Sequence, residues 1–215
     1  MTTEKQQKLK ALAKKQDPQL TQLELKLDWT PLSDNGSSFK TTAFKQLNIS
    51  RLVSKKTLGA WVFTLAVNFI ALLISSLLVY TLFIEESPKL LMIVSTMLAF
   101  SLMFVIAGIW LIFNPKPWIF DKTKGWLWQG SKQLHKDQDF LPLKEAVRLS
   151  NVAAIQILPK KISDESKYTS WEFNLVCKNG KRINIMDHAN KKSILKDAYF
   201  LSEFLSIPIW EISDY

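Results

Sequence analysis

The sequence predicts an α+β membrane protein that combines a two-helix transmembrane hairpin with a small antiparallel β-sheet or barrel, capped by a C-terminal helix. Three observations lead to this fold class. Two uncharged apolar runs, 58–84 and 90–113, are separated by only five residues. Several short segments after residue 114 alternate apolar and polar residues, which is the period of β-strands. The last segment, 190–205, has apolar residues spaced as on one face of a helix.

The two apolar runs are long enough to cross a lipid bilayer. A hydrocarbon core of about 30 Å needs roughly 20 apolar residues in a helix, and both runs exceed that length. The alternative is a pair of core helices in a soluble protein, but such helices carry a polar stripe and these runs have none. We therefore interpret residues 58–113 as a transmembrane helical hairpin.

The distribution of charge predicts the topology. The net charge of +9 divides into +6 for residues 1–57, −1 for 58–113 and +4 for 114–215. Because positively charged flanks stay in the cytoplasm, both termini are expected inside and the turn outside, as in a multi-pass protein of the cytoplasmic (inner) membrane. A basic chain can also bind nucleic acid. The flanking charges already account for much of the surplus, so no nucleic-acid partner is expected.

Residues 1–19 are polar and lysine-rich, and we expect a basic flexible tail. This stretch lacks the apolar core of a signal peptide, so the first membrane helix is expected to act as an uncleaved targeting signal. The single cysteine, Cys177, excludes an internal disulfide and suits a reducing cytoplasm.

Residues 20–57 are expected to form a cytoplasmic β-hairpin segment. Apolar residues alternate with polar ones in the stretch 20–29, as in a half-buried strand: Leu23, Leu25, Leu27 and Trp29. A turn is expected at 34–37 and a second strand-like pattern at 39–53. Since an isolated hairpin is barely stable in water, we expect this segment to pack on the domain that follows the membrane helices.

Aromatic side chains mark the expected membrane interfaces. Four residues near the ends of the helices are predicted interface anchors: Trp61, Tyr80, Trp110 and Trp118. Small residues four apart favour close helix contact: Ala71 with Ser75, and Ser95 with Ala99.

Asn68 is the one strongly polar side chain within the two spans. An amide at that depth either marks a transport pathway or hydrogen-bonds a neighbouring helix or a partner subunit. Neither span contains a titratable Asp, Glu, Lys, Arg or His, so we interpret the hairpin as an anchor and not as an ion or proton route.

Residues 114–215 are predicted to form a β-rich domain that ends in a helix. Strands are expected at 118–120, 126–128, 141–148, 152–158, 171–177 and 183–185. A Gly-containing turn at 121–125 joins the first two strands, a loop is expected at 159–167, and Asn179-Gly180 predicts a type I′ hairpin turn. Asn190 is positioned to cap a helix that ends near Leu205.

Two stretches of this region, 119–125 (IFDKTKG) and 198–210 (AYFLSEFLSIPIW), together with the central strands, carry a resemblance. They resemble bacterial inner-membrane proteins of unknown function that have a two-helix hairpin and a pleckstrin-homology-like cytoplasmic domain. The plan is also similar to that of the chloroplast membrane protein that helps assemble photosystem I. The likeness spans roughly residues 58–211, its motifs are fold-level, and the N-terminal segment is longer than in that plan. It implies a binding or assembly module on the cytoplasmic side.

Signatures of catalysis are absent from the sequence, which has no HExxH, CxxC, GxSxG or Gly-rich phosphate loop. With only His135, His188 and Cys177, a His/Cys zinc site is not available. Asp187 and His188 are adjacent, but neighbouring strand residues point to opposite sides. We interpret His188 as a surface residue at a strand-to-helix junction and Cys177 as a small core residue. No enzymatic activity, metal or cofactor is expected.

Basic residues provide the strongest candidate binding site: Lys178, Lys181, Arg182, Lys191 and Lys192. Lysines at the start of a helix oppose its dipole, so helix stability does not explain the last two. Together these residues are a candidate site for an anionic lipid headgroup or an acidic partner. The alternative is an ordinary solvated basic surface.

The function expected from these features is non-catalytic binding or assembly of other membrane proteins from the cytoplasmic face. Its partners are then the lipid bilayer and either a membrane protein or a second copy of the chain. The alternatives are an anionic-lipid sensor that uses the basic residues, an immunity protein against a membrane-acting toxin, and a membrane enzyme whose site has no recognisable motif.

Overall fold

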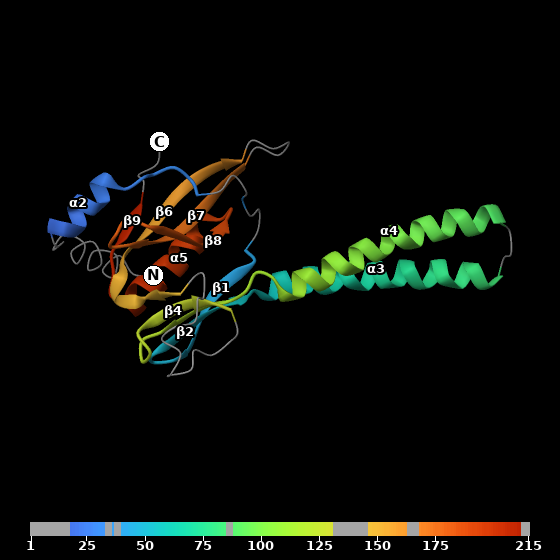
Figure 1. The fold of residues 1–215 in the computed structure, drawn as a ribbon, viewed down its shortest axis with the longest axis horizontal. Coiled ribbons are helices and arrows are strands. Elements are labelled where there is room, and N and C mark those ends of the chain that lie inside the picture. The colour runs from blue at the N-terminus through green and yellow to red at the C-terminus, as the bar shows by residue number, and fades with distance from the viewer. Residues whose placement is uncertain are drawn as a thin grey trace. The chain divides into compact units, whose positions relative to one another are not determined.

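The computed structural model describes residues 18–32, 36, 40–84, 88–130, 146–162 and 168–211. The protein is an α+β chain and divides into two compact units (Figure 1). The helical unit comprises residues 56–116. The β unit comprises residues 1–55 and 117–215, so it is assembled from chain segments on both sides of the helical unit. The turn expected at 34–37 lies almost entirely outside the described residues, and so does the tail up to residue 17.

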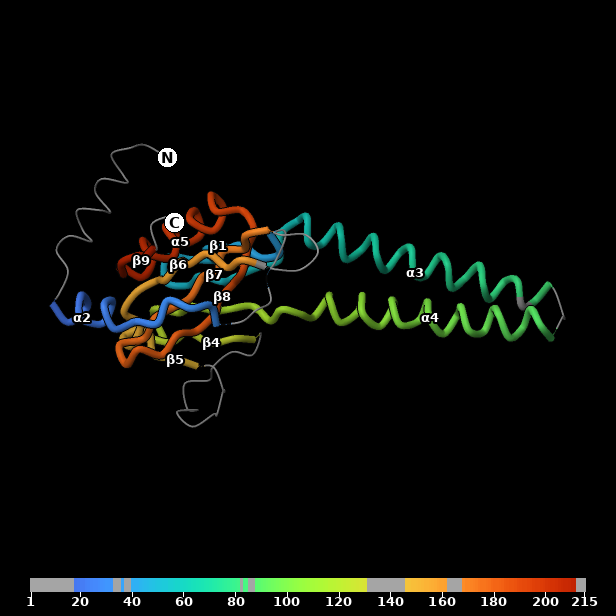
Figure 2. The backbone as a smooth tube through the Cα atoms, turned by 90° about the horizontal axis from the view of Figure 1, so that it is seen from above, coloured from blue at the N-terminus to red at the C-terminus, as the bar shows by residue number. Residues whose placement is uncertain are grey.

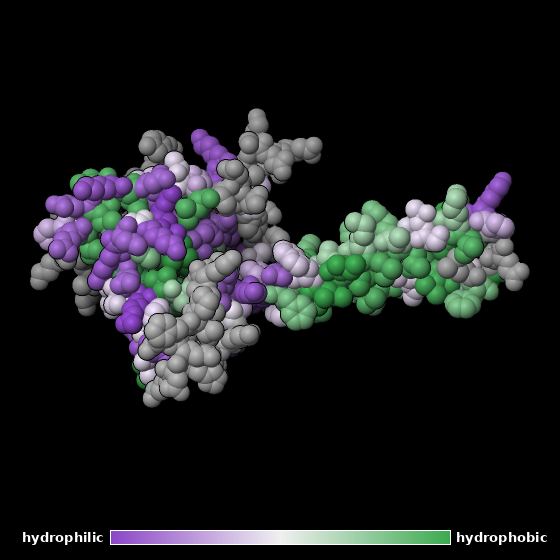
Figure 3. Space-filling view, viewed as in Figure 1, coloured by the Kyte–Doolittle hydropathy of each residue, from purple (hydrophilic) through white to green (hydrophobic). Residues whose placement is uncertain are grey.

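The helical unit consists of two helices, α3 (Leu58–Ile84) and α4 (Pro88–Phe113), which lie side by side (Figures 1 and 2). Both are long and apolar enough to cross a membrane, and few of their residues are buried. Figure 3 shows the resulting apolar surface along this unit, in contrast to the mixed surface of the β unit. Helix α4 begins two residues earlier than expected because Pro88 fits the first helical position, where its missing N–H costs nothing.

Small side chains allow α3 and α4 to approach closely. The buried residues of α4 are Val94, Ser101 and Gly108, which are seven residues apart, the repeat of a coiled-coil seam. The Ser101 hydroxyl lies 2.7 Å from the Ser75 hydroxyl and donates a hydrogen bond to the Ala71 carbonyl at 3.1 Å. The sequence predicted that α4 contacts α3 through Ser95 and Ala99. That prediction is wrong, because both residues are exposed and the contact residues of α4 recur every seven residues and not every four.

Asn68 packs against Gly108 in the same seam. Its side-chain amide donates a hydrogen bond to the Thr64 carbonyl of its own helix at 2.7 Å. A Cβ atom at position 108 would lie 2.4 Å from Asn68 Oδ1, so only glycine fits opposite this side chain.

Lys56 joins the two ends of the helical unit. Its ammonium group donates hydrogen bonds to the carbonyls of Leu111 and Ile112, in the last turn of α4, and lies 5.3 Å from the centre of the Trp61 ring. A cation at these carbonyls is favoured by the helix dipole. Burial lowers the pKa of Lys56 from its ordinary value.

The β unit contains two sheets. Sheet A has the order β1 (Thr42–Asn48), β2 (Arg51–Lys56), β3 (Trp118–Asp121), β4 (Trp126–Gln129) and β5 (Val147–Arg148). Sheet B has the order β8 (Arg182–His188), β7 (Tyr168–Cys177), β6 (Val152–Ile162) and β9 (Ile209–Glu211). Within the described residues the sheets do not close into a barrel. A short 3₁₀ turn, η1 (Leu149–Asn151), connects β5 to β6.

Pairing of β2 with β3 joins the chain before the helical unit to the chain after it. The strands are antiparallel, with Leu52 opposite Phe120 and Val53 opposite Ile119. The main-chain N–H of Trp118 also donates to the Ser54 hydroxyl at 2.7 Å. The two flanks of the apolar hairpin therefore belong to one sheet.

The strand expected at 20–29 is wrong, because Pro18–Lys26 form helix α2. Leu20, Leu23 and Leu27 have helical spacing and pack against Ala154, Val176 and Trp210, whereas Leu25 is 81 % exposed. Pro18 at the first helical position also favours a helix. The alternation of Leu23, Leu25 and Leu27 matched a strand only because two of these residues also belong to the helical pattern.

Two local predictions in sheet B are also corrected. The turn between β7 and β8 is not type I′, because Gly180 has a positive φ and Asn179 does not. The Gly180 N–H donates to the Cys177 carbonyl at 2.9 Å, which fits a type I turn followed by a left-handed glycine. The loop expected at 159–167 begins later, because β6 continues to Ile162; residues 163–167 and the first part of 141–148 lie outside the described residues.

The main core lies between the two sheets and helix α5 (Lys191–Leu205). Phe44 of β1 makes edge-on contacts with Phe120 of β3 and Phe173 of β7, at ring-centre distances of 5.7 and 5.9 Å. Helix α5 contributes four apolar side chains: Ile194, Ala198, Leu201 and Phe204. Asn190 caps this helix as expected, since its side chain accepts a hydrogen bond from the Ser193 N–H at 3.0 Å.

We predict that Gly108→Ala destabilises the helix pair by about 1–3 kcal/mol, because the added methyl group collides with the Asn68 amide. The measurement is unfolding of the purified full chain by SDS in mixed micelles. Gly59→Ala is the matched control, because nothing lies within 4 Å of a Cβ atom there. Asn68→Ala should restore most of the loss; an unrelieved loss in the double variant would contradict the assigned contact.

Candidate functional site: the polar face of sheet B

The basic residues singled out in the sequence do not form one cluster. Lys178, Lys181 and Arg182 lie at the β7–β8 turn, whereas Lys191 and Lys192 follow the other end of β8. A strand of seven residues separates the two groups by ~20 Å.

Two of these basic residues are held by partners in the β unit. Arg182 lies 3.0 Å from the Asp28 carboxylate and donates to the Thr30 carbonyl at 2.7 Å. Lys191 lies 3.1 Å from Glu211 and 4.4 Å from the centre of the Trp171 ring. The lysines at 178, 181 and 192 are exposed.

Of the four predicted interface anchors, three lie on the helical unit with exposed rings: Trp61, Tyr80 and Trp110. Trp118 is wrong as an anchor. It is only 4 % exposed and belongs to the main core of the β unit, because β3 begins at this residue. His188 is also buried and not on the surface as predicted; its Nδ1 accepts a hydrogen bond from the Asn190 N–H at 2.8 Å. Burial lowers its pKa, and Lys40 adds to that effect. Cys177 is buried, as expected.

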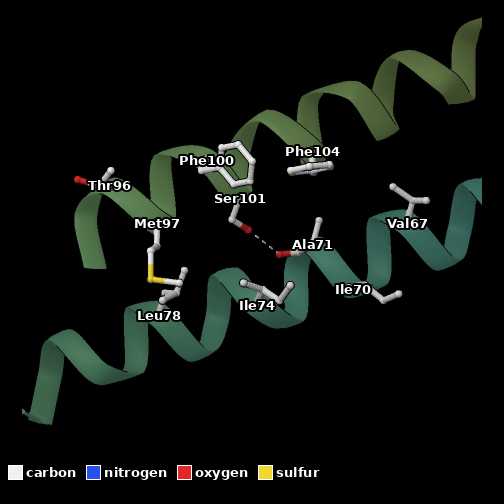
Figure 4. Close-up of a pocket in the computed structure, with 10 residues that line it drawn as sticks. All are labelled: Val67, Ile70, Ala71, Ile74, Leu78, Thr96, Met97, Phe100, Ser101 and Phe104. Atoms are coloured by element: carbon white, nitrogen blue, oxygen red, sulfur yellow. Dashed lines mark hydrogen bonds between the residues drawn. The ribbon is translucent and has the colours of Figure 1, made fainter. Parts of the chain in front are cut away.

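The helical unit has an apolar groove of about 650 Å³ on one side of the α3–α4 seam (Figure 4). Its walls include Ile70 and Ile74 of α3 with Phe100 and Phe104 of α4, and the Ser101 hydroxyl points across the seam to Ala71. The lining is apolar apart from Thr96 and Ser101.

The face of sheet B opposite α5 is polar although it is buried. Along β6 and β7 the residues Ile155, Ile157, Phe173 and Leu175 point into the main core. The intervening residues form the other face, and they include polar residues at most 2 % exposed, among them Gln156, Lys160, Glu172 and Asn174. Asn184 and Asp187 of β8 extend this set. We call these six residues, with Arg182, the polar face.

The polar face is covered by the chain between α2 and β1. Gln156 donates to the Asp28 carbonyl at 3.0 Å, Arg182 donates to the Thr30 carbonyl, and the Glu172 carboxylate accepts the Leu32 N–H at 2.9 and 3.1 Å. The segment follows a bent path: the chain bends at Leu27, Thr30 and Leu32, and the Thr30 N–H donates to the Asp28 carboxylate at 2.9 Å. Figure 2 shows this N-terminal segment running along sheet B. We call residues 27–32 the covering segment.

Charges on the polar face form a compact network. Lys160 Nζ lies 3.3 Å from Glu172 and 3.0 Å from Asp187, so one buried cation faces two carboxylates. Asn174 donates to Glu172 at 2.7 Å and Asn184 donates to Asp187 at 3.0 Å. Burial raises the pKa of Asp187; the Asn184 and Lys160 hydrogen bonds act against that rise, and the negative charge of Glu172 adds to it.

The groups of the polar face have two kinds of partner. Gln156, Arg182 and Glu172 bond main-chain groups of the covering segment. Lys160, Asn174, Asn184 and Asp187 bond other members of the face. Within the described part of the chain, no three His, Cys, Asp or Glu side chains are placed to hold a metal ion.

No protein-family profile and no curated protein sequence matches this chain.

Sequence reasoning missed the polar face. Strand residues that alternate with large apolar ones normally face solvent, and the polar residues of β6 and β7 follow that pattern. Lys160 falls in the predicted loop 159–167, because Pro159 interrupts the alternation of apolar and polar residues. The one available signal was the number of amides and charges at alternate positions in two neighbouring strands, which does not by itself show that another segment covers them.

We predict that Lys160→Met lowers the free energy of unfolding by about 3–5 kcal/mol, because it leaves the buried Glu172 and the half-buried Asp187 carboxylates without their cation. The measurement is chemical unfolding of the full chain in detergent, followed by tryptophan fluorescence. Lys161→Met, at the exposed neighbouring position, is the matched control and should change stability by no more than about 0.5 kcal/mol. Equal effects of the two variants would contradict the network.

We predict a pH dependence from Asp187. Its pKa is raised in the folded protein, so the folded state binds this proton more tightly than the unfolded state. The contribution of Asp187 is therefore favourable at low pH and is lost as pH rises from its ordinary value of 3.8 through the raised value. Asp187→Asn should flatten this loss in the pH profile of unfolding. Asp28→Asn should change the pH profile of unfolding in the opposite direction, because hydrogen bonds from Thr30 lower the pKa of Asp28.

Proposed function

We propose that this chain is a non-catalytic, two-pass protein of the cytoplasmic membrane that binds or assembles other membrane proteins through its β unit. Helices α3 and α4 anchor it in the bilayer. The proposed partners are the lipid bilayer and a membrane protein. No residue is given a catalytic role.

One observation carries the proposal. Three side chains of the polar face hold the main chain of a peptide segment: Gln156, Arg182 and Glu172 bond the Asp28 carbonyl, the Thr30 carbonyl and the Leu32 N–H. Hydrogen bonds to the main chain give affinity for a peptide and have no role in activating a substrate. This supports a binding module over an enzyme.

The proposed topology places the β unit in the cytoplasm. Because β2 and β3 pair, the flanks on either side of the hairpin lie on the same side of any membrane that α3 and α4 cross. Those flanks carry net charges of +6 and +4 whereas the hairpin region carries −1, which supports a cytoplasmic β unit. We further propose that the β unit is pleckstrin-homology-like, supported by two mainly antiparallel sheets that share a core with one C-terminal helix.

In-cell crosslinking of the tagged full chain, followed by detergent extraction, affinity capture and mass spectrometry, tests the assembly function. The expected result is one membrane protein captured in near-stoichiometric amount, which captures this chain in the reciprocal experiment. A tagged two-helix anchor of unrelated sequence is the control. Recovery of the chain alone, or only with itself, would overturn the proposal.

We predict the topology by cysteine labelling in a Cys177→Ser background. Lys89→Cys, at the exposed start of α4, should react with a membrane-impermeant maleimide in intact cells. Ser206→Cys, at the exposed end of α5, should react only after lysis. Labelling of both positions in intact cells, or of Ser206→Cys alone, would contradict a cytoplasmic β unit.

A further inference from the structure

We infer that the polar face of sheet B is a binding site for an acidic segment of a partner protein, and that residues 27–32 occupy it as an internal substitute. The inference rests on the proposed function and names its site and the chemistry of the partner. In the partner segment, a carboxylate would lie against Arg182 and a main-chain N–H four residues later against Glu172, as Asp28 and Leu32 do.

The polar residues of this face are poorly explained by stability. Gln156, Lys160, Glu172 and Asn174 are at most 2 % exposed. Well-packed apolar residues of similar volume usually stabilise a protein as much as a buried ion pair does, or more. Their value lies instead in the directed hydrogen bonds that they offer to a segment laid across the sheet.

The groups on the face specify the segment that they accept. Gln156 and Arg182 donate to carbonyls two residues apart, and Glu172 accepts an N–H two residues further on. All three are main-chain groups, so these contacts select a conformation, the bent path of residues 27–32, and not a sequence. Sequence preference comes from Arg182, whose guanidinium pairs with the Asp28 carboxylate at 3.0 Å, and from the apolar patch of Ala154, Val176 and Trp210 beside it.

The covering segment is held by side-chain contacts outside the main core. None of the residues of α2, which precedes it, is buried, and Leu27 is the one buried residue among residues 27–32. Leu20, Leu23 and Trp29 are partly buried where they pack against Ala154, Val176 and Trp210. Residues 27–32 belong to no strand, so side chains of the sheet hold them without a ladder of main-chain bonds. Peripheral segments of this kind open at free energies below that of global unfolding.

The polar side chains of the face keep hydrogen-bond partners within the face when the covering segment leaves. Glu172 keeps its contacts to Lys160 and Asn174, and Arg182 keeps a contact of 3.4 Å to Gln156. Arg182 loses both Asp28 and the Thr30 carbonyl and is left as a cation without a carboxylate. The vacated face therefore favours an incoming acidic segment. A partner anchored in the same membrane competes with the covering segment through its high local concentration.

The test uses the full chain in lipid nanodiscs and a labelled peptide of residues 18–32 as the probe. Leu27→Ala combined with Asp28→Ala weakens the covering segment and should raise peptide affinity at least about tenfold over the wild-type chain, where the tethered segment competes. Arg182→Glu in this background should abolish binding, and a peptide with Asp28→Arg should restore it. Lys181→Glu, at the exposed neighbouring position, is the matched control and should leave binding intact.

A second measurement needs no variant. Hydrogen exchange of the wild-type chain should show the Leu32 N–H exchanging far faster than the Phe173 N–H of the core strand, because the covering segment opens alone. Equal protection of the two amides would overturn the inference.

The remaining outcomes also decide between proposals. No peptide binding to the vacated face, with a membrane partner still captured in cells, would overturn this inference and leave the proposed function standing. A concentration-dependent dimer of the wild-type chain in which residues 27–32 are exchanged would overturn this inference, because the binding partner would then be a second copy of the chain and not another protein. Peptide binding with no partner captured would overturn the proposed function instead.

Discussion

Pairing of β2 with β3 is the constraint on which the rest of the structure depends. It places Leu52 opposite Phe120, both fully buried, and so closes a core from chain segments that are separated by the whole helical unit. The entropic cost of such closure grows only slowly with loop length. The α3–α4 pair reduces it further, because Lys56 already holds the start of the hairpin against the carbonyls at its end. A β unit that needs both flanks cannot form on one side of the hairpin alone.

The same construction explains why one face of sheet B stays outside the main core. Sheet A and helix α5 cover the apolar face of sheet B and complete the main core. The opposite face is then left to the N-terminal segment, which reaches it from a peripheral helix with no buried residue. Polar groups on that face hydrogen-bond one another and the covering segment, so the face is buried although it is not part of the apolar core. This division separates the apolar core of the β unit from the polar face to which we assign the proposed binding.

Most of the secondary structure could be predicted from the sequence, and the failures have physical causes. The apolar runs of α3 and α4, the Asn190 cap and the strands around Phe173 follow from local patterns. Helix α2 was missed because its leucines fit two periods, and only packing against Trp210 selects between them. The polar face was missed because Glu172 and Gln156 look like solvent-facing residues until a segment 140 residues away from Glu172 in sequence covers them. The basic residues were grouped by sequence proximity, whereas β8 holds them apart.

The most direct test of this account is a distance between the covering segment and the sheet in the full chain. Spin labels at Pro31→Cys and Lys161→Cys, both exposed positions, in a Cys177→Ser background, would report it by pulsed electron resonance in nanodiscs. The account predicts one short distance for the chain alone and a second, longer population that grows as excess 18–32 peptide is added. A single distance that does not change at any peptide concentration would show that the segment is a fixed part of the fold, and would contradict the account.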